Sequence, residues 1–150
     1  MAEVQTVYSD SIVAGYPGMV ANGETSNRIS RTVEDAAGIA FGKAVFRGAG
    51  DQGVTATVGS GFLGFTIADA GTVALPGADA DEYQQYASAP VITSGAVYVT
   101  AGENVTDGAQ VYVDPDDKAI VDTATDNIIA TGWVFDQTVS TGAVVRISKR

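Results

Sequence analysis

The segment Gly95-Ala96-Val97-Tyr98-Val99-Thr100 is echoed fourteen residues later by Ala109-Gln110-Val111-Tyr112-Val113-Asp114. Both are rich in β-branched and aromatic residues, which pack well on a pleated sheet. The two segments predict two strands around a loop in which Val105 turns back toward the fold. If they pair, Tyr98 and Tyr112 lie on like faces. Two separate strands that merely share common β-forming residues fit the repeat equally well.

The rest of the chain continues this period of two in short apolar runs separated by glycine-bearing turns. The pattern predicts an all-β fold, a compact barrel or sandwich (jelly-roll or β-tulip-like) of short antiparallel strands with an extended N-terminal arm. At 150 residues the chain has the length of one domain with its own core. The expected strands are residues 28–34, 39–47, 53–58, 62–67, 89–100, 110–114, 118–121, 128–135 and 143–149.

Two segments depart from the strand pattern. Residues 1–27 mix Gly, Pro and Ser with isolated large apolar side chains, which favours an extended arm preceding a single β domain over residues 28–150. The acidic segment 78–87 is expected to form an irregular loop. One short helical turn carrying Tyr83 and Tyr86 is the alternative.

The chain has no histidine and no cysteine. It therefore lacks the side chain that titrates near neutrality, the usual base that activates a nucleophile, and the N and S ligands of zinc. Carboxylates in Asp79–Glu82 or Asp114–Asp117 are the remaining catalytic material, but solvated turns do not separate two pKa values as acid–base catalysis requires. We expect a protein that is not an enzyme, with no catalytic residue and no cofactor.

Metal and phosphate sites are also not expected. Asp114, Asp116, Asp117 and Asp122 supply oxygen ligands of the kind that Ca²⁺ prefers, but Pro115 and Lys118 depart from a calcium loop, so an Asx-Pro turn is expected. The glycine-rich stretch 58–64 has no Lys-Ser/Thr ending and no following helix. The aromatic residues of the expected strands are assigned to the core, with Trp133 as an alternative interface anchor.

Charge and hydropathy constrain the partners. The net charge is −10 with eight basic residues, which argues against nucleic acid. No segment has the roughly 20 apolar residues of a membrane span and no signal peptide is evident, so a protein made in the cytoplasm is expected, without a membrane partner. No basic residue occurs between Arg47 and Lys118. This asymmetry predicts either a polar molecule that orients on a lattice or an acidic face that only confers solubility.

Six segments follow one another along the chain: Gly15-Tyr16-Pro17-Gly18-Met19-Val20-Ala21, Asn27-Arg28-Ile29-Ser30-Arg31-Thr32-Val33-Glu34, Gly38-Ile39-Ala40-Phe41-Gly42-Lys43-Ala44-Val45, Phe62-Leu63-Gly64-Phe65-Thr66, Val91-Ile92-Thr93-Ser94-Gly95-Ala96-Val97-Tyr98-Val99 and Gly108-Ala109-Gln110-Val111-Tyr112-Val113. In this order they resemble the structural cement or capsid decoration proteins of tailed bacteriophages. The resemblance covers nearly the whole chain and implies a β-rich protein that attaches to the outside of an HK97-like shell of major capsid protein and reinforces its joints. It supplies no catalytic residue, no cofactor and no residue-level contact.

The expected role is a non-enzymatic cement protein on the outer surface of the phage capsid, assembled in the host cytoplasm. The arm is expected to make apolar contacts with the major capsid protein, and Arg28 to orient the molecule through a carboxylate pair. Arg28 and Arg31 fall on opposite faces of a regular strand, so Arg31 is assigned a structural pair. A homotrimer is expected, with a dimer as the alternative. The inferred contact residues are Tyr8, Tyr16, Pro17, Met19 and Arg28.

Two other functions are compatible with parts of the sequence. A virion tail or surface β module that binds a host receptor or glycan would also display Tyr and Trp on a flat face. Its copy number would be a dozen or fewer per particle, against hundreds for a cement protein. A carboxylate-dependent hydrolase would require Asp79, Asp81 or Glu82 for activity.

Overall fold

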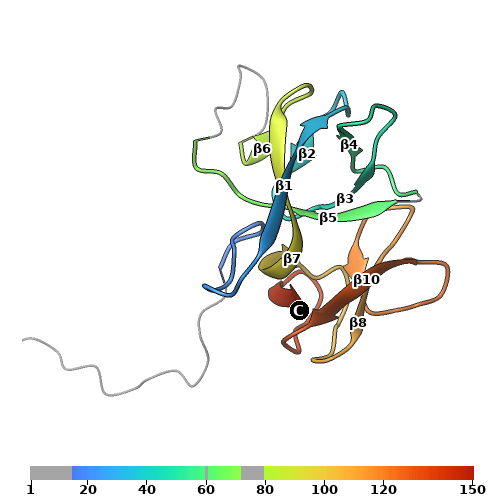
Figure 1. Cartoon of the computed structure of the whole chain (residues 1–150). Helices are drawn as coiled ribbons and strands as arrows, with labels where there is room; N and C mark the ends of the chain where they lie inside the picture. Colours follow the sequence, from blue (N-terminus) through green and yellow to red (C-terminus); the bar gives the residue numbers. More distant parts are fainter. Residues whose placement is uncertain (1–14, 60, 72–79) are drawn as a thin grey trace, which may run out of the picture.

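The structure is a computed structural model that describes residues 15–59, 61–71 and 80–150 (Figure 1). In this part of the chain all regular elements are β-strands, which confirms the all-β prediction. The strands are β1 (Asn27–Val33), β2 (Ile39–Ala40), β3 (Ala44–Arg47), β4 (Gly53–Thr55), β5 (Phe62–Thr66), β6 (Glu82–Tyr83), β7 (Ser88–Thr100), β8 (Gln110–Val113), β9 (Ile120–Val121), β10 (Ile128–Phe135) and β11 (Val144–Lys149). No helix in the described residues is long and apolar enough to cross a membrane.

Five strands close into a first barrel in the order β1-β4-β3-β5-β7. β1 closes it, because it pairs in parallel with β4 on one edge and antiparallel with β7 on the other. The antiparallel ladder runs from Asn27 opposite Ser94 to Thr32 opposite Ser88. The short pair β2–β6 lies beside this barrel. The parallel β1–β4 pair is an exception to the expected antiparallel arrangement.

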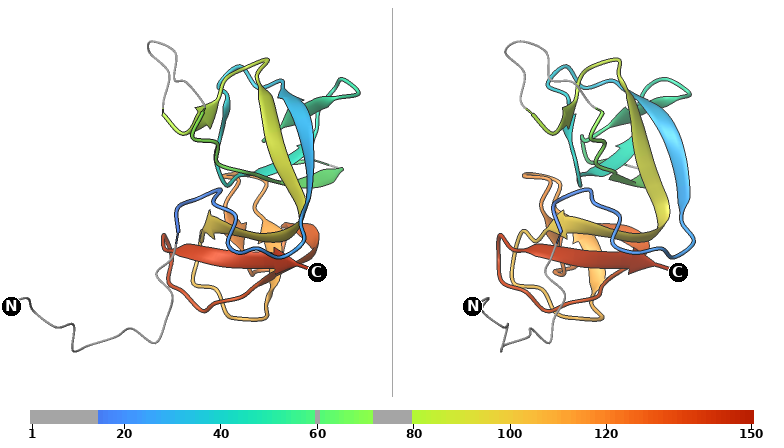
Figure 2. Two further views of the ribbon diagram at one scale, coloured as in Figure 1. Left: turned by 60° about the vertical axis from the view of Figure 1, so that its left-hand side comes forward. Right: turned by 90° about the vertical axis from the view of Figure 1, so that its left-hand side faces the viewer.

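The second half of β7 belongs to a second barrel, in the order β7-β11-β10-β8-β9. A parallel bridge between Ala101 and Ile120 brings β9 back to the end of β7, and the Gly102 N–H donates to the Ile120 carbonyl at 2.8 Å. The two views in Figure 2 show β7 passing from one barrel into the other. One strand is therefore common to both halves of the molecule.

A glycine lies where β7 changes barrels. Gly95 has φ 122°, and a Cβ there would lie 2.7 Å from the Ser26 Cβ. An L side chain is disfavoured on both counts. Before Gly95 the strand pairs with β1 and β5, and after it with β11. The predicted strand 89–100 is thus confirmed, and its glycine allows one strand to serve two barrels.

The buried side chains form two clusters. The smaller fills the first barrel and contains Val33, Ile39, Phe41, Val45, Val54, Ala56, Tyr83, Ala89 and Val91. The larger fills the second barrel and continues onto the outer face of β3 and β5, where Phe46 and Phe65 point away from the first cluster. Trp133 is fully buried there and its ring meets the Phe65 ring edge-on at 5.0 Å. The core assignment of Trp133 is confirmed, and the two barrels share apolar packing at their junction.

Two expectations were wrong in detail. The strand predicted over residues 39–47 breaks into β2 and β3, because Gly42 adopts φ 70° and a Cβ there would lie 2.7 Å from the Gly18 nitrogen. Residues 82–83, within the segment expected to be an irregular loop, form a short strand, and Tyr83 is buried with its hydroxyl donating to the Ile67 carbonyl. Of the two interpretations left open for the repeats around Tyr98 and Tyr112, the structure has the second, because β7 and β8 are strands that do not pair with each other; Val105 between them is buried as expected.

Residues 15–26, the described portion of the expected arm, lie along β7 of the same chain. The Gly18 N–H donates to the Tyr98 carbonyl, the Tyr98 N–H donates to the Met19 carbonyl, and the Ala21 N–H donates to the Ala96 carbonyl. Val20 forms an isolated antiparallel bridge with Val97. This segment therefore supplies backbone partners to the second half of β7.

Candidate functional site

A groove of about 720 Å³ lies where residues 15–17 meet the junction of the two barrels. We call it the arm groove. Tyr16 and Pro17 form one wall, the turn between β2 and β3 forms another, and the end of β7 with the start of β9 forms the third. Tyr16 is 59% exposed, an unusual state for a large aromatic side chain. The remaining lining residues are Ala40, Phe41, Gly42, Lys43, Ala68, Asp69, Ala70, Ala80, Asp81, Thr100, Ala101, Gly102, Asp117, Lys118, Ala119 and Ile120.

Charges of both signs surround the arm groove. Lys43 and Lys118 line it together with Asp69, Asp81 and Asp117, and all five side chains are exposed. No pairing between them is formed in the described residues. A surface of this kind offers an aromatic and apolar floor with charged groups around it, which is typical of a protein-binding site.

The structure brings together only part of the predicted contact set. Tyr16 and Pro17 share the arm groove, while Met19 is half-buried beside them in the chain. Arg28 lies on β1 and is exposed, with its Nε donating to the Ser26 hydroxyl at 3.1 Å. Tyr8 lies outside the described residues. Arg28 is not among the residues that line the arm groove, so the predicted set does not form one continuous site there.

Arg31 forms a hydrogen bond within the chain, and among the described residues it has no carboxylate partner of the kind expected for it. It is half-buried, and its Nη1 donates to the Gln52 side-chain oxygen. Arg28 and Arg31 are three residues apart on β1, so the alternation of a strand assigns their side chains to opposite faces.

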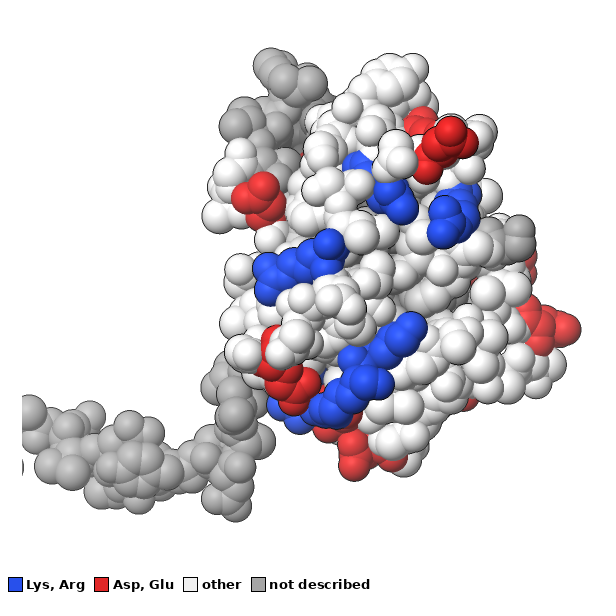
Figure 3. Space-filling view, in the orientation of Figure 1, with Lys and Arg blue, Asp and Glu red and all other residues white. Residues whose placement is uncertain are grey.

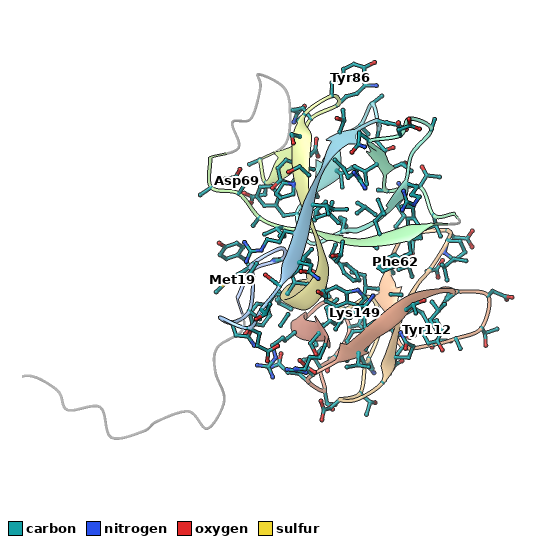
Figure 4. The ribbon with its side chains drawn as sticks, in the orientation of Figure 1. Met19, Phe62, Asp69, Tyr86, Tyr112 and Lys149 are labelled. Carbon is teal, nitrogen blue, oxygen red and sulfur yellow. The ribbon has the colours of Figure 1, made fainter. Side chains whose placement is uncertain are left out.

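A second groove of about 450 Å³ lies elsewhere along the junction and shares no lining residue with the first. We call it the Lys149 groove. Gly59, Gly61, Phe62 and Leu63 line it from the first barrel, and Ile128, Ile129, Thr131 and Lys149 line it from the second. Figure 4 shows Phe62 and Lys149 close together at the middle of the face. Sequence reasoning missed this site, because its two sides are more than sixty residues apart in the chain.

Lys and Arg side chains gather on the face of the molecule shown in Figure 3. They lie over the middle of that face, whereas most of the Asp and Glu side chains visible there lie nearer its margins. The chain as a whole carries a charge of −10. A locally basic face on an acidic protein favours contact with a partner surface that carries carboxylates.

The aspartates considered for catalysis or calcium hold turns. The Asp114 carboxylate accepts the Asp116 N–H at 2.8 Å, and the Asp117 carboxylate accepts the Ala119 N–H at 2.9 Å. These are Asx turns, as expected around Pro115. In the described ranges, no three acidic side chains gather closely enough to hold a metal ion. Asp79 lies outside those ranges.

An ion pair joins the segment before β1 to the C-terminal residue. The Arg150 guanidinium lies 2.9 Å from the Glu24 carboxylate. This hydrogen bond lowers the pKa of Glu24 and raises the pKa of Arg150. Asp136 is a more distant partner of Arg150, at 3.9 Å.

Comparison with known proteins decides the family. The family model described as "Structural cement protein (E217 gp24/Pam3 gp6)" matches residues 4–149. The chain belongs to the structural cement protein family. This membership makes it a structural protein of the phage particle that associates with the capsid. The comparison with curated proteins gives no match.

Two solved structures are similar to this chain. A chain from the capsid of Myoviridae phage XM1 superposes with a TM-score of 0.65 at 18% identity, covering 99% of this chain and 97% of that one. The N base of the head fibre gp8.5 of bacteriophage phi29 superposes with a TM-score of 0.47 at 12% identity, covering 84% and 95%. The XM1 match shows that the two-barrel fold occurs in another phage protein.

Proposed function

We propose that this cement protein binds the outer surface of an HK97-like lattice of major capsid protein and stabilises the mature head without catalysing a reaction. The family match over residues 4–149 carries the proposal. The absence of histidine and cysteine and the use of Asp114 and Asp117 in turns agree with a role in binding.

Stabilisation follows from mass action. A protein that binds the assembled lattice, but binds free or precursor capsomers less well, lowers the free energy of the lattice by its binding free energy. Repetition over many copies on one shell multiplies this gain. Binding after expansion follows if adjacent capsid subunits together form the docking surface.

The arm groove is the proposed point of contact that uses the predicted residues. Tyr16 offers a large exposed ring at its rim, and Pro17 lies in the wall behind it. Met19 helps to fix this segment, because its carbonyl accepts a hydrogen bond from the Tyr98 N–H. Arg28 and Tyr8 remain proposed contacts outside this groove. A trimer, or alternatively a dimer, would match the cyclic symmetry of the lattice.

The direct experiment compares heads that lack the protein with heads to which purified protein has been added back. Decorated heads are expected to retain DNA at higher temperature and through stronger osmotic shock. Equal survival of bare and decorated heads would contradict reinforcement.

Copy number on the purified virion separates this function from a host-binding tail module. Quantitative mass spectrometry is expected to find hundreds of copies per particle, located on the outer capsid surface by labelling. A dozen or fewer copies at the tail would favour the receptor-binding or glycan-binding function.

A Tyr16→Ala variant tests the arm groove. Loss of an exposed aromatic contact is expected to weaken binding to heads by about tenfold or more if the ring anchors the interface. Tyr86→Ala is the matched control, since Tyr86 is 77% exposed but does not line the arm groove. Equal binding by both variants would remove Tyr16 from the interface.

A further inference from the structure

We propose that the Lys149 groove receives an extended, acidic segment of the major capsid protein, in which carboxylates flank an apolar side chain. This inference rests on the proposed function and names a second contact within it. Apolar exposure, local charge and an open strand edge each support it.

The groove concentrates exposed apolar side chains. Ile128 is 36% exposed and Ile129 is 47% exposed, and these two are half of the large hydrophobic residues that are exposed in the described part of the chain. Consecutive strand residues point to opposite faces, so exposure of both leaves the start of β10 open to solvent on either side. Phe62 and Leu63, both half-buried, provide the opposite wall. An apolar recess of this kind accommodates one large side chain from a partner.

Cations border the same recess. Lys149 lines it, and its stem lies across Gly132, where a Cβ would be 3.0 Å from the Lys149 Cε. Arg47 borders the other side. Its side chain covers Gly61, and its backbone N–H donates to the Gly61 carbonyl at 3.0 Å. No carboxylate is among the described lining residues. The charge therefore selects an acidic occupant.

The neighbouring strand edge favours an extended occupant. β10 pairs with β11 only through Val134 and Phe135, although β10 begins at Ile128. In the described structure no strand of this chain pairs with residues 128–133 on that edge. An open edge next to an apolar recess is the arrangement to which proteins add an extended peptide.

The experiment measures co-sedimentation of the full-length protein with expanded heads that lack it. Ile129→Ser and Lys149→Glu are each expected to weaken binding by about tenfold or more, while Ile129→Val and Lys149→Arg retain it. Tyr86→Ser and Arg150→Glu are the apolar and charge controls, because neither residue lines the Lys149 groove or the arm groove, and both variants are expected to bind more tightly than their groove counterparts. Thermal melting by circular dichroism confirms that each variant is folded.

The outcomes separate the two proposals. If the wild-type protein does not bind heads, the proposed function fails. If the wild type binds and both groove variants bind equally well, the function stands and the groove assignment is wrong. If Arg150→Glu weakens binding as much as Lys149→Glu, binding responds to net charge and the assignment is also wrong.

A cross-link identifies the occupant. Because the chain contains no cysteine, Ile129→Cys introduces a single thiol to which a short photo-activated cross-linker can be attached. On decorated heads, mass spectrometry is expected to find residue 129 joined to a segment of the major capsid protein that contains Asp or Glu. Cross-linking mainly to a second copy of this chain, or to a capsid segment without acidic residues, would overturn the proposal.

Discussion

The two barrels share β7 but close in different ways. The first is closed by a backbone ladder between β1 and β7, from Asn27 opposite Ser94 to Thr32 opposite Ser88. The second is closed by the single Ala101–Ile120 bridge. Side chains there form hydrogen bonds with backbone groups that the strand pairing does not satisfy. A ladder tolerates many side chains because its hydrogen bonds come from the backbone. The second barrel should therefore be more sensitive to single substitutions and to pH.

Two side chains illustrate this dependence in the second barrel. Gln110 Nε2 lies 2.8 Å from the carbonyls of both Ala130 and Trp133, where β10 is irregular. The Glu103 carboxylate accepts the N–H groups of Asp122 and Thr123 at 2.9 and 2.8 Å, just after β9. In the first barrel, by contrast, the Glu34 carboxylate accepts N–H groups in the turn between β3 and β4, away from the closing ladder.

The largest effect is expected from Trp133→Ala. Trp133 is fully buried and contacts Phe65 of the first barrel across the junction. Its loss leaves a cavity shared by both halves and should lower the free energy of unfolding by about 3–5 kcal/mol. Calorimetry is expected to show one transition at a lower temperature. Two separate transitions, with one at the wild-type midpoint, would show that the barrels unfold independently.

Gln110→Leu is expected to lower the free energy of unfolding by a smaller amount, about 1–3 kcal/mol, because the Ala130 and Trp133 carbonyls in β10 lose their hydrogen-bond donor. Gln52→Leu is the matched control in the first barrel. Gln52 is exposed, and its own backbone carbonyl still accepts the Thr32 N–H at 2.9 Å. Its effect should stay within about 0.5 kcal/mol. If urea denaturation gives the same loss of unfolding free energy for both variants, the second barrel is not more sensitive to substitution than the first.

The sequence predicted the strands better than it predicted their partners. Period-two alternation and glycine-bearing turns located most strands, and the buried aromatic residues followed from the same alternation. The failures lie where distant segments meet. Gly42 interrupts a strand because Pro17 and Gly18 pack against it, and Tyr83 is buried where β6 pairs with β2. No local pattern carries this information.

For the candidate sites, the sequence likewise indicates single exposed residues but not the grooves that those residues share with distant segments. Exposure of Tyr16 and Arg28 could be expected from their place in or beside a Gly- and Pro-containing segment, and the structure shows both exposed. Lys43 and Lys118, which line the arm groove together with Tyr16, lie in the turns between β2 and β3 and between β8 and β9. The Lys149 groove likewise joins residues near 62 to residues near 129. Such sites depend on tertiary packing and are visible only once the two barrels are assembled.

Glu103→Gln should produce a pH-dependent effect smaller than that of Gln110→Leu. Partial burial raises the pKa of Glu103, but the hydrogen bonds from Thr123 and Asp122 outweigh it and hold the pKa below the ordinary value of 4.5. A lowered carboxyl pKa contributes stability above pH 4.5, and this contribution is lost as pH falls through the folded pKa. Denaturation midpoints measured from pH 7 to pH 3 should therefore fall more steeply in the wild type than in Glu103→Gln. Parallel curves would exclude Glu103 as an acid-sensitive group.

The smallest effect on stability is expected at the Glu24–Arg150 pair, which lies on the surface and is screened by salt. Arg150→Gln should leave the unfolding midpoint nearly unchanged, yet it should return the pKa of Glu24 toward its ordinary value of 4.5, because the Arg150 hydrogen bond is the main cause of the lowering. Carboxyl NMR titration measures this directly, with Arg150→Lys as a control that keeps the charge. If the pKa of Glu24 does not move in Arg150→Gln, the pair does not form in solution, and residues 15–26 are held on β7 by their backbone hydrogen bonds, as the first barrel is by its ladder.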